Sequence, residues 1–237
     1  MTLKNYLSER EELHKLFSKE MDQPLNERYV CYDGAVHPEN YLKSKFKIAW
    51  LLKEAYDSPN GIGGGWSWSE LLPKDELYNN FKKLSHQTWH PITYVSFAIL
   101  NNFPVYMDIP YIHQSQNLCE SLWEIAVVNT QKLPSKTTTK SHYRIIKKAF
   151  ETHSHLIKKQ LKMLNADILI CGSTMSLYKE MFGLSDIDIK SNGSVNYWIK
   201  NGKIFIDAYH PAQRTISREI YVNDILSAVK IWSDGLC

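Results

Sequence analysis

Short apolar runs alternate with segments of helical periodicity, and this alternation restricts the possible folds more than any other feature of the sequence. Three runs have the length and composition of buried strands: residues 46–52 (FKIAWLL), 124–129 (EIAVVN) and 166–171 (ADILIC). A fourth strand is expected at 203–208, in a hairpin with 195–199. Asn201-Gly202 lies between them and suits a type I′ turn, which needs positive φ at both central positions.

Helical periodicity fills the segments between these runs. Amphipathic helices are expected over three segments: residues 3–20, 141–164 and 217–232. A shorter helix is expected after Gly172, where Ser173 or Thr174 could cap it. Strands separated by helices predict an α/β fold, here a three-layer α/β/α sandwich with a central, mainly parallel sheet of four strands.

The composition fits one globular domain. Of the 237 residues 43% are hydrophobic, and no Pro- or Ser-rich linker interrupts them. We therefore expect a single domain over residues 1–237, with an N-terminal helical extension over about residues 1–45. The four cysteines lack Cys-x-x-Cys spacing, which speaks against a zinc ribbon or a disulfide scaffold. Because no apolar stretch reaches the roughly 18–20 residues of a membrane span and the first residues are charged, we expect a cytoplasmic protein without membrane contact. We also expect a monomer.

Positive charge is concentrated in one segment. Residues 132–162 hold nine basic residues and one acidic residue, a local charge of +8, whereas the whole chain carries +3. A field of this sign suits a polyanion such as DNA. Lysines that solvate the outer face of a helix are the alternative interpretation.

Ligands of parallel α/β sheets bind at the carboxyl ends of the strands, so the residues after each expected strand are the candidates for chemistry. Glu54 and Asp57 follow the first strand, and two such carboxylates could orient and deprotonate a water molecule. Asn129 ends the second strand and offers both a donor and an acceptor, which suits the edge of a pyrimidine. A solvated loop start and an ordinary turn asparagine are the alternatives.

The third and fourth strand ends add two more candidates. Gly172-Ser173 opens a helix, whose free N–H groups favour an anion such as phosphate. His210 follows the last strand and is stiffened by Pro211. It could donate a hydrogen bond to an oxygen of a departing base, or hold positive charge near it.

A glycine-rich segment lies between the first strand and the next helices. Its four glycines between residues 61 and 65 do not form a dinucleotide-binding fingerprint, because the last glycine of that motif would fall on Trp66. We expect a mobile loop that carries Trp66 and Trp68 and could close over a ligand as a lid.

Taken in chain order, the four strand ends resemble the uracil-DNA glycosylase superfamily. That family has an acidic motif after its first strand, an asparagine after its second, a glycine at a helix start and a final His-Pro-Ser/Ala loop. These places are occupied here by Glu54 with Asp57, Asn129, Gly172 and His210-Pro211-Ala212. The likeness covers about residues 46–232, and the run Asn129-x-x-Lys132-x-Pro134 is similar to the iron–sulfur branch.

The chain also departs from the family pattern. Lys53 stands where a glycine usually precedes the acidic residue, and no proline follows that residue. The cysteine ligands of the iron–sulfur branch are absent, so we expect no cluster, no other cofactor and no metal.

The resemblance implies that the protein binds DNA, flips a modified or damaged pyrimidine out of the stack and hydrolyses its N-glycosidic bond, as in base excision. It also implies a role for each matching residue. These are water activation by Glu54 or Asp57, stabilisation of the leaving base by His210, base contact by Asn129, Tyr56, Trp66 and Trp68, and DNA contact by Lys132, Ser173, Pro211, Gln213 and Arg214.

The target base stays open at this point. A bulky modified cytosine of phage DNA, such as glucosylated hydroxymethylcytosine, would make the protein an antiviral defence, and uracil or another damaged pyrimidine is the other possibility. A non-catalytic nucleic-acid-binding member of the same fold and a small-molecule α/β enzyme are the competing functions.

Overall fold

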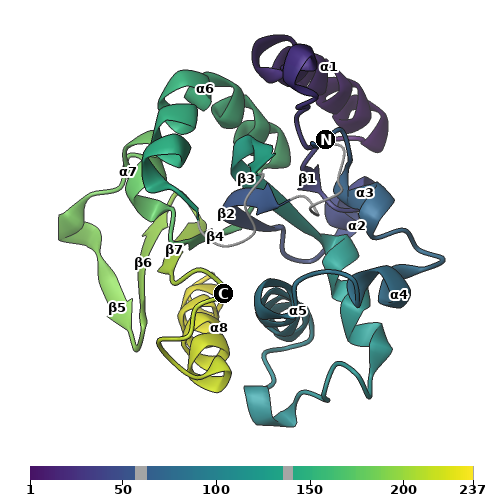
Figure 1. Ribbon diagram of the computed structural model, residues 1–237. Helices are drawn as coiled ribbons and strands as arrows, with labels where there is room; N and C mark the ends of the chain where they lie inside the picture. The colour runs from purple at the N-terminus through teal and green to yellow at the C-terminus, as the bar shows by residue number, and fades with distance from the viewer. Residues whose placement is uncertain (57–62, 136–140, 237) are drawn as a thin grey trace.

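The computed structural model describes residues 1–56, 63–135 and 141–236, and across these residues seven strands form one mixed sheet (Figure 1). The order in the sheet is β1-β3-β2-β4-β7-β6-β5. In chain order the strands are β1 (Gly34–Ala35), β2 (Ile48–Tyr56), β3 (Ile125–Ser135), β4 (Ile168–Gly172), β5 (Lys190–Asn192), β6 (Val195–Lys200) and β7 (Lys203–Ala208). The expected α/β class is therefore confirmed, with a wider and more mixed sheet than the four strands expected.

The centre of the sheet is parallel. Ile48 of β2 pairs with Ile125 of β3 on one side and with Ile168 of β4 on the other, and Ile168 in turn pairs with Ile204 of β7. All four isoleucines are fully buried, as expected for strands covered on both faces. This register aligns the carboxyl ends of β3, β2, β4 and β7 along one edge.

The additional strands lie outside this centre. β1 runs antiparallel to β3, and β6 joins β7 and β5 in antiparallel pairs. β1 has two residues and β5 has three largely exposed polar residues, so neither carries a hydrophobic pattern that sequence reasoning could detect. The hairpin between β6 and β7 is as expected, with φ of 52° at Asn201 and 73° at Gly202.

Helices cover both faces of the sheet (Figure 1). One face carries α1, α6 and α7, and the other carries α5 and α8, each over its own cluster of buried side chains. The α-helices are α1 (Leu3–Met21), α2 (Pro38–Lys43), α3 (Trp68–Leu71), α4 (Leu77–Phe81), α5 (His86–Leu100), α6 (Tyr143–Leu164), α7 (Met175–Phe182) and α8 (Arg218–Asp234). Short 3-10 helices are η1 (Pro24–Asn26), η2 (Tyr106–Asp108), η3 (Gln116–Glu124) and η4 (Asp186–Asp188).

The N-terminal segment is part of the fold. α1 buries Tyr6, Leu13, Phe17 and Met21 in the cluster that also receives α6. The segment then supplies β1 to the sheet, so residues 1–45 contribute both a helix and a strand to the domain. Among the described residues no helix is both long enough and apolar enough to cross a membrane.

The turn after β4 is built differently from the expected helix cap. Thr174 precedes α7, but its Oγ1 donates to the carbonyl of Leu51 at 2.8 Å. Ser173 Oγ accepts the backbone N–H of His210 at 2.8 Å. Both side chains therefore tie strand ends together, and neither caps the helix.

Candidate active site

A cavity of about 440 Å³ opens at the carboxyl ends of β2, β3 and β7. Six residues expected at the site from the sequence line it: Glu54, Tyr56, Trp66, Trp68, Asn129 and His210. They come from four separate parts of the chain, and the parallel register brings them together. Asp57 lies outside the described residues.

Glu54 lies near the end of β2 with its side chain half-buried in the cavity wall. Its Oε1 is buried and has no hydrogen-bond partner among the described residues. Burial raises the pKa of this carboxyl, against the lowering effect of a hydrogen bond from Ser141 and of nearby positive charges. A carboxylate with a free oxygen and a raised pKa is suited to accept a proton from water.

His210 lies in the loop after β7, in a fixed tautomer. Its Nδ1 accepts the backbone N–H of Ala212 at 3.2 Å, so in the neutral ring the proton lies on Nε2. Burial, aided by the charge of Lys53, lowers the pKa of His210 to about 4. The ring is therefore neutral at physiological pH and offers one N–H donor toward a ligand.

Gly172, at the end of β4, sets how closely the His210 loop approaches the sheet. A Cβ atom there would lie 2.9 Å from Cδ2 of Leu52 and 3.2 Å from Cδ of Pro211. A side chain at this position would have to displace the Leu52 side chain or the Pro211 loop, because the loop packs directly on the strand end. Pro211 is buried at this contact, so it packs the loop and is not exposed to a phosphate.

Asn129 lies in β3 with 1% of its surface exposed. Its backbone N–H donates to Oδ2 of Asp33 at 2.6 Å. Its side-chain Nδ2 is buried and has no partner within the described part of the chain. An unpaired amide costs about 1–3 kcal/mol, so a buried donor that lines a cavity indicates a place where a ligand acceptor would be bound.

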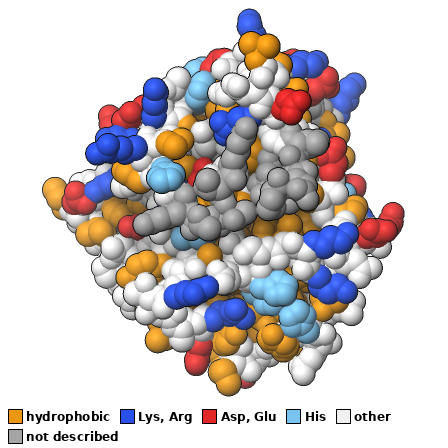
Figure 2. All heavy atoms as spheres, in the orientation of Figure 1, with side chains coloured by type: hydrophobic (Ala, Val, Ile, Leu, Met, Phe, Trp, Pro, Cys, Tyr) orange, Lys and Arg blue, Asp and Glu red, His pale blue; other side chains and the backbone are white. Residues whose placement is uncertain are grey.

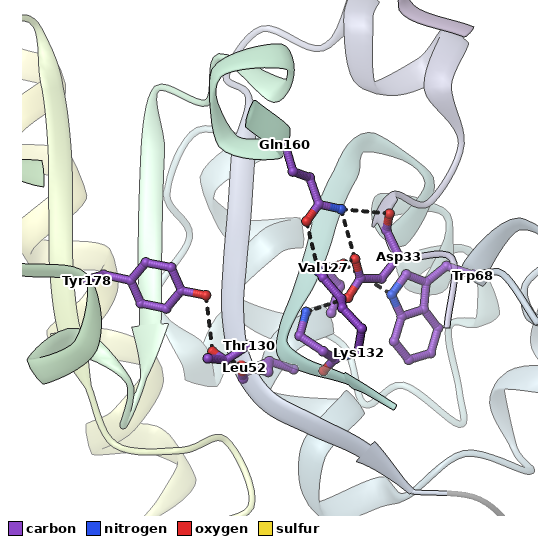
Figure 3. Close-up of polar contacts among 9 residues, drawn as sticks. Asp33, Leu52, Trp68, Val127, Thr130, Lys132, Gln160 and Tyr178 are labelled. Carbon is purple, nitrogen blue, oxygen red and sulfur yellow. Dashed lines mark hydrogen bonds and ion pairs between the residues drawn. The ribbon is translucent and has the colours of Figure 1, made fainter. Parts of the chain in front are cut away.

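The Asp33 carboxylate that binds the backbone of Asn129 also belongs to a buried ion pair with Lys132, shown in Figure 3. Lys132 Nζ contacts Asp33 Oδ1 at 2.7 Å and Gln160 Oε1 at 2.8 Å, and Gln160 Nε2 donates to Asp33 Oδ1 at 2.8 Å. Lys132 is 1% exposed. The resemblance implies that Lys132 contacts DNA, but its ammonium group is held inside the fold and does not reach the surface.

Aromatic rings form one wall of the cavity. Trp68 stands 4.9 Å from Trp66 and 4.9 Å from Trp89 between ring centroids. Trp68 is held by a 3.1 Å hydrogen bond from its Nε1 to the carbonyl of Val127 (Figure 3). Tyr56, at the rim, shares a 2.8 Å hydrogen bond with Ser141. Sequence reasoning missed Trp89, because it lies within a helix and not directly after an expected strand.

The glycine-rich segment is better anchored than expected in its described part, residues 63–65. The carbonyl of Gly63 accepts the N–H of Tyr29 at 2.8 Å, and the N–H of Gly65 donates to Val30 at 3.1 Å. Trp68, expected on a mobile loop, begins α3 and is buried. Residues 63–68 are therefore bonded to the rest of the domain in this structure, and Gly61 lies outside the described residues.

The remaining expected DNA contacts differ in their exposure. Ser173 and Arg214 are exposed at the surface. Gln213, expected to fill the gap left by a flipped base, instead uses its Oε1 to accept two backbone N–H groups, from Thr215 and Ile216. That side chain holds its own loop in shape.

The basic segment is divided in the structure. Six basic residues of α6 are exposed: Arg144, Lys147, Lys148, Lys158, Lys159 and Lys162. Lys159 and Lys162 line a hollow with the acidic Glu9 and Glu12 of α1, which reduces their net field. Figure 2 likewise shows Lys and Arg side chains on several sides of the visible face, without a single stripe.

The structure contains two clusters of histidines that were not predicted from the sequence. His153 and His155 are two residues apart in α6, a spacing that places side chains on different sides of a regular helix, yet both contact Glu20 at 3.2 Å. The reason is a kink in α6 at His153, where φ is −116°. His86, His90 and His113 form the second cluster; the spacing of four between the first two, which places them on one helix face, was a signal in the sequence.

Neither a protein-family model nor a curated protein matches this sequence. The case for a function therefore depends on the site itself.

Proposed function

We propose that the protein is a DNA glycosylase that hydrolyses the N-glycosidic bond of a flipped pyrimidine. The observation that carries the proposal is the joint placement of Glu54, Asn129 and His210 in one cavity. The reaction needs an amide that binds the edge of the base, a carboxylate that activates water and a neutral hydrogen-bond donor to the leaving base.

In the proposed reaction, the oxygen of a water molecule bonds to the anomeric carbon of the sugar while the bond from that carbon to the base nitrogen breaks. The bonding electron pair leaves with the base, and Glu54 takes the proton of the water. The negative charge of Glu54 also stabilises the oxocarbenium-like sugar. The Nε2–H of His210 donates to an oxygen of the departing base, where negative charge develops.

The size and walls of the cavity favour a flat base with room for a substituent. A volume of about 440 Å³ lies within the usual range for small-molecule sites, roughly 300–1,000 Å³. Trp66, Trp68 and Trp89 supply stacking surfaces. We propose a bulky modified cytosine such as glucosylated hydroxymethylcytosine of phage DNA, with a role in antiviral defence, and uracil as the alternative substrate.

We also propose that the four parallel strands form the centre of a three-layer α/β/α sandwich, as in the uracil-DNA glycosylase superfamily. We further propose that the protein acts as a monomer in the cytoplasm, with DNA as its partner. Arg144, Lys148 and Arg214 are exposed and available to bind phosphates.

The test is incubation of the purified protein with oligonucleotides and phage genomic DNA that contain uracil, hydroxymethylcytosine or its glucosylated form. Release of a free base together with alkali-labile abasic sites is expected for one substrate. The matched control is Glu54→Gln, which keeps the size of the side chain. Tight, salt-sensitive binding without base release from any substrate would contradict the proposal and favour a non-catalytic DNA-binding protein instead.

A further inference from the structure

Three histidine side chains meet beside α5, outside the cavity. His86 and His90 are one turn apart on α5, and His113 comes from the segment between η2 and η3. One ring nitrogen of each lies within 4.8 Å of the other two. Figure 2 shows histidine side chains gathered over α5 on this face. None of the three is among the described residues that line the cavity.

The central histidine has an unexplained polar atom. His90 is only 2% exposed, and its Nε2 is buried without a hydrogen-bond partner in the part of the chain that the structure describes. Buried ring nitrogens are normally paired, so this one requires a partner that the protein itself does not supply. Its ring lies between those of Phe81 and His86, stacked on both.

His113 is oriented for a ligand on its other nitrogen. Its Nδ1 shares a hydrogen bond of 3.1 Å with the hydroxyl of Tyr78. In protein metal sites a histidine that ligates through one nitrogen usually bonds a second protein group through the other. Tyr78 therefore supplies to His113 the outer contact that metal-binding histidines have, and leaves Nε2 free.

From this geometry we propose that His86, His90 and His113 bind one divalent transition-metal ion of the zinc class. Three imidazole nitrogens without a carboxylate or thiolate suit zinc, and solvent completes a tetrahedral site because His86 and His113 are exposed. The Arg218 guanidinium lies 5.9 Å from the Tyr94 ring, which is itself 6.4 Å from the His90 ring, so one positive charge near the site opposes binding of the cation.

The ion links α5, which forms part of the cavity wall, to the segment that contains His113. α5 contributes Thr88 and Trp89 to the cavity, and His113 belongs to a segment with little regular structure. Binding to both fixes that segment against α5. The metal site thus stabilises the wall from outside and is independent of the proposed glycosylase reaction.

The test uses the full chain, first stripped with a chelator and then titrated with Zn²⁺ in a calorimeter. One zinc ion per chain is expected, together with a rise in melting temperature, because a ligand that binds only the folded state stabilises it. Titration with Co²⁺ as a spectroscopic probe is expected to give the visible absorption of a tetrahedral complex. Absence of stoichiometric zinc binding overturns the proposal.

Variants identify the ligands. His86→Gln and His113→Gln change exposed residues, so the fold is expected to survive, and each is expected to weaken zinc binding by more than about 100-fold, beyond the 10–100-fold loss typical of an outer contact. Tyr78→Phe tests that outer contact. The matched control is the double variant His153→Gln with His155→Gln, which removes the histidines around Glu20 and is expected to bind normally. The assignment is overturned if the control variant loses zinc binding while His86→Gln and His113→Gln keep it.

Discussion

The carboxylate of Asp33 accepts a 2.6 Å hydrogen bond from the backbone N–H of Asn129, so an acid 96 residues earlier in the chain fixes the position of the residue proposed to read the base. The other carboxylate oxygen of Asp33 is held by Lys132 and Gln160. The cavity wall at Asn129 is therefore supported by a fully connected polar network. The network involves β3, α6 and the residue that precedes β1.

Asp33→Asn is expected to destabilise the protein by about 3–5 kcal/mol, because it leaves the buried ammonium of Lys132 without its counter-charge. Lys132→Met is expected to cost a similar amount. The double variant should be much less destabilised than the sum of the two, because no buried charge remains. Urea unfolding of the three variants measures these free energies. Additive losses would show that the two side chains act independently.

Glu54→Gln is expected to lower the rate of base release by about 10²–10⁴-fold, the usual contribution of a general base, with DNA affinity little changed. The comparison is Asp57→Asn, because the sequence leaves both carboxylates as candidates. Single-turnover rates and binding assays separate catalysis from affinity. If Asp57→Asn alone abolishes base release, Asp57 is the base.

The pH dependence of base release should have an acid limb that belongs to Glu54. Burial raises the pKa of Glu54, and the reaction needs its ionised form, so the rate is expected to fall as pH decreases through a value above that of an ordinary glutamate. His210 has a pKa of about 4 and is already neutral above it, so it adds no alkaline limb. A rate that falls as pH rises through about 6.5, the ordinary histidine value, would mean that protonated His210 is needed.

The same raised pKa predicts the effect of Glu54 on stability. A carboxyl whose pKa is higher in the folded state than in the unfolded state makes folding less favourable once pH exceeds the unfolded value. Glu54→Gln is therefore expected to be more stable than the wild type at neutral pH and equally stable in acid. Melting temperatures over a pH series measure this difference. A variant less stable than wild type at neutral pH would indicate that the carboxylate contributes contacts to the fold.

Gly172→Ala is expected to reduce base release and to destabilise the protein by about 1–3 kcal/mol, the usual cost of overpacking. The added methyl group would push Leu52 and the Pro211 loop apart and displace His210. Gly235→Ala is the matched control, because a Cβ there has no neighbour closer than 3.5 Å. Equal activity in the two variants would show that the loop position does not limit the reaction.

The strand ends could be predicted from the sequence because buried parallel strands are recognisable as apolar runs. The runs around Ile48, Ile125 and Ile168 and the hairpin strand that ends at Ala208 are the four parallel strands of the structure. Polar residues at the ends of three of these strands, β2, β3 and β7, line one cavity. This is why Glu54, Asn129 and His210 could be named in advance. The physical basis is that a parallel register aligns all carboxyl ends, whatever the lengths of the intervening helices.

The roles of the other site residues could not be predicted, because they depend on contacts between residues that are distant in the sequence. The resemblance assigns Lys132 to DNA contact, whereas its burial requires Asp33 and Gln160, which no local pattern connects to it. Trp89 was missed and Gln213 was assigned to DNA because contacts with other parts of the fold, not local sequence, decide where their side chains point. Trp89 packs on Trp68, and Gln213 accepts backbone hydrogen bonds. The substitution Gly64→Val, attractive as a test of a mobile loop, would place a Cβ atom 1.9 Å from the carbonyl oxygen of Tyr29 and would disturb the fold instead.

The buried network also sets when the wall at Asn129 becomes fully supported during folding. Gln160 reaches Asp33 across 127 positions of the chain, so the network is complete only after α6 has docked on the sheet. A chain in which α6 is still free can form the bond between Asp33 and Asn129 but lacks the contacts of Gln160 with Asp33 and Lys132. The last support of this wall is therefore added in the step that docks α6.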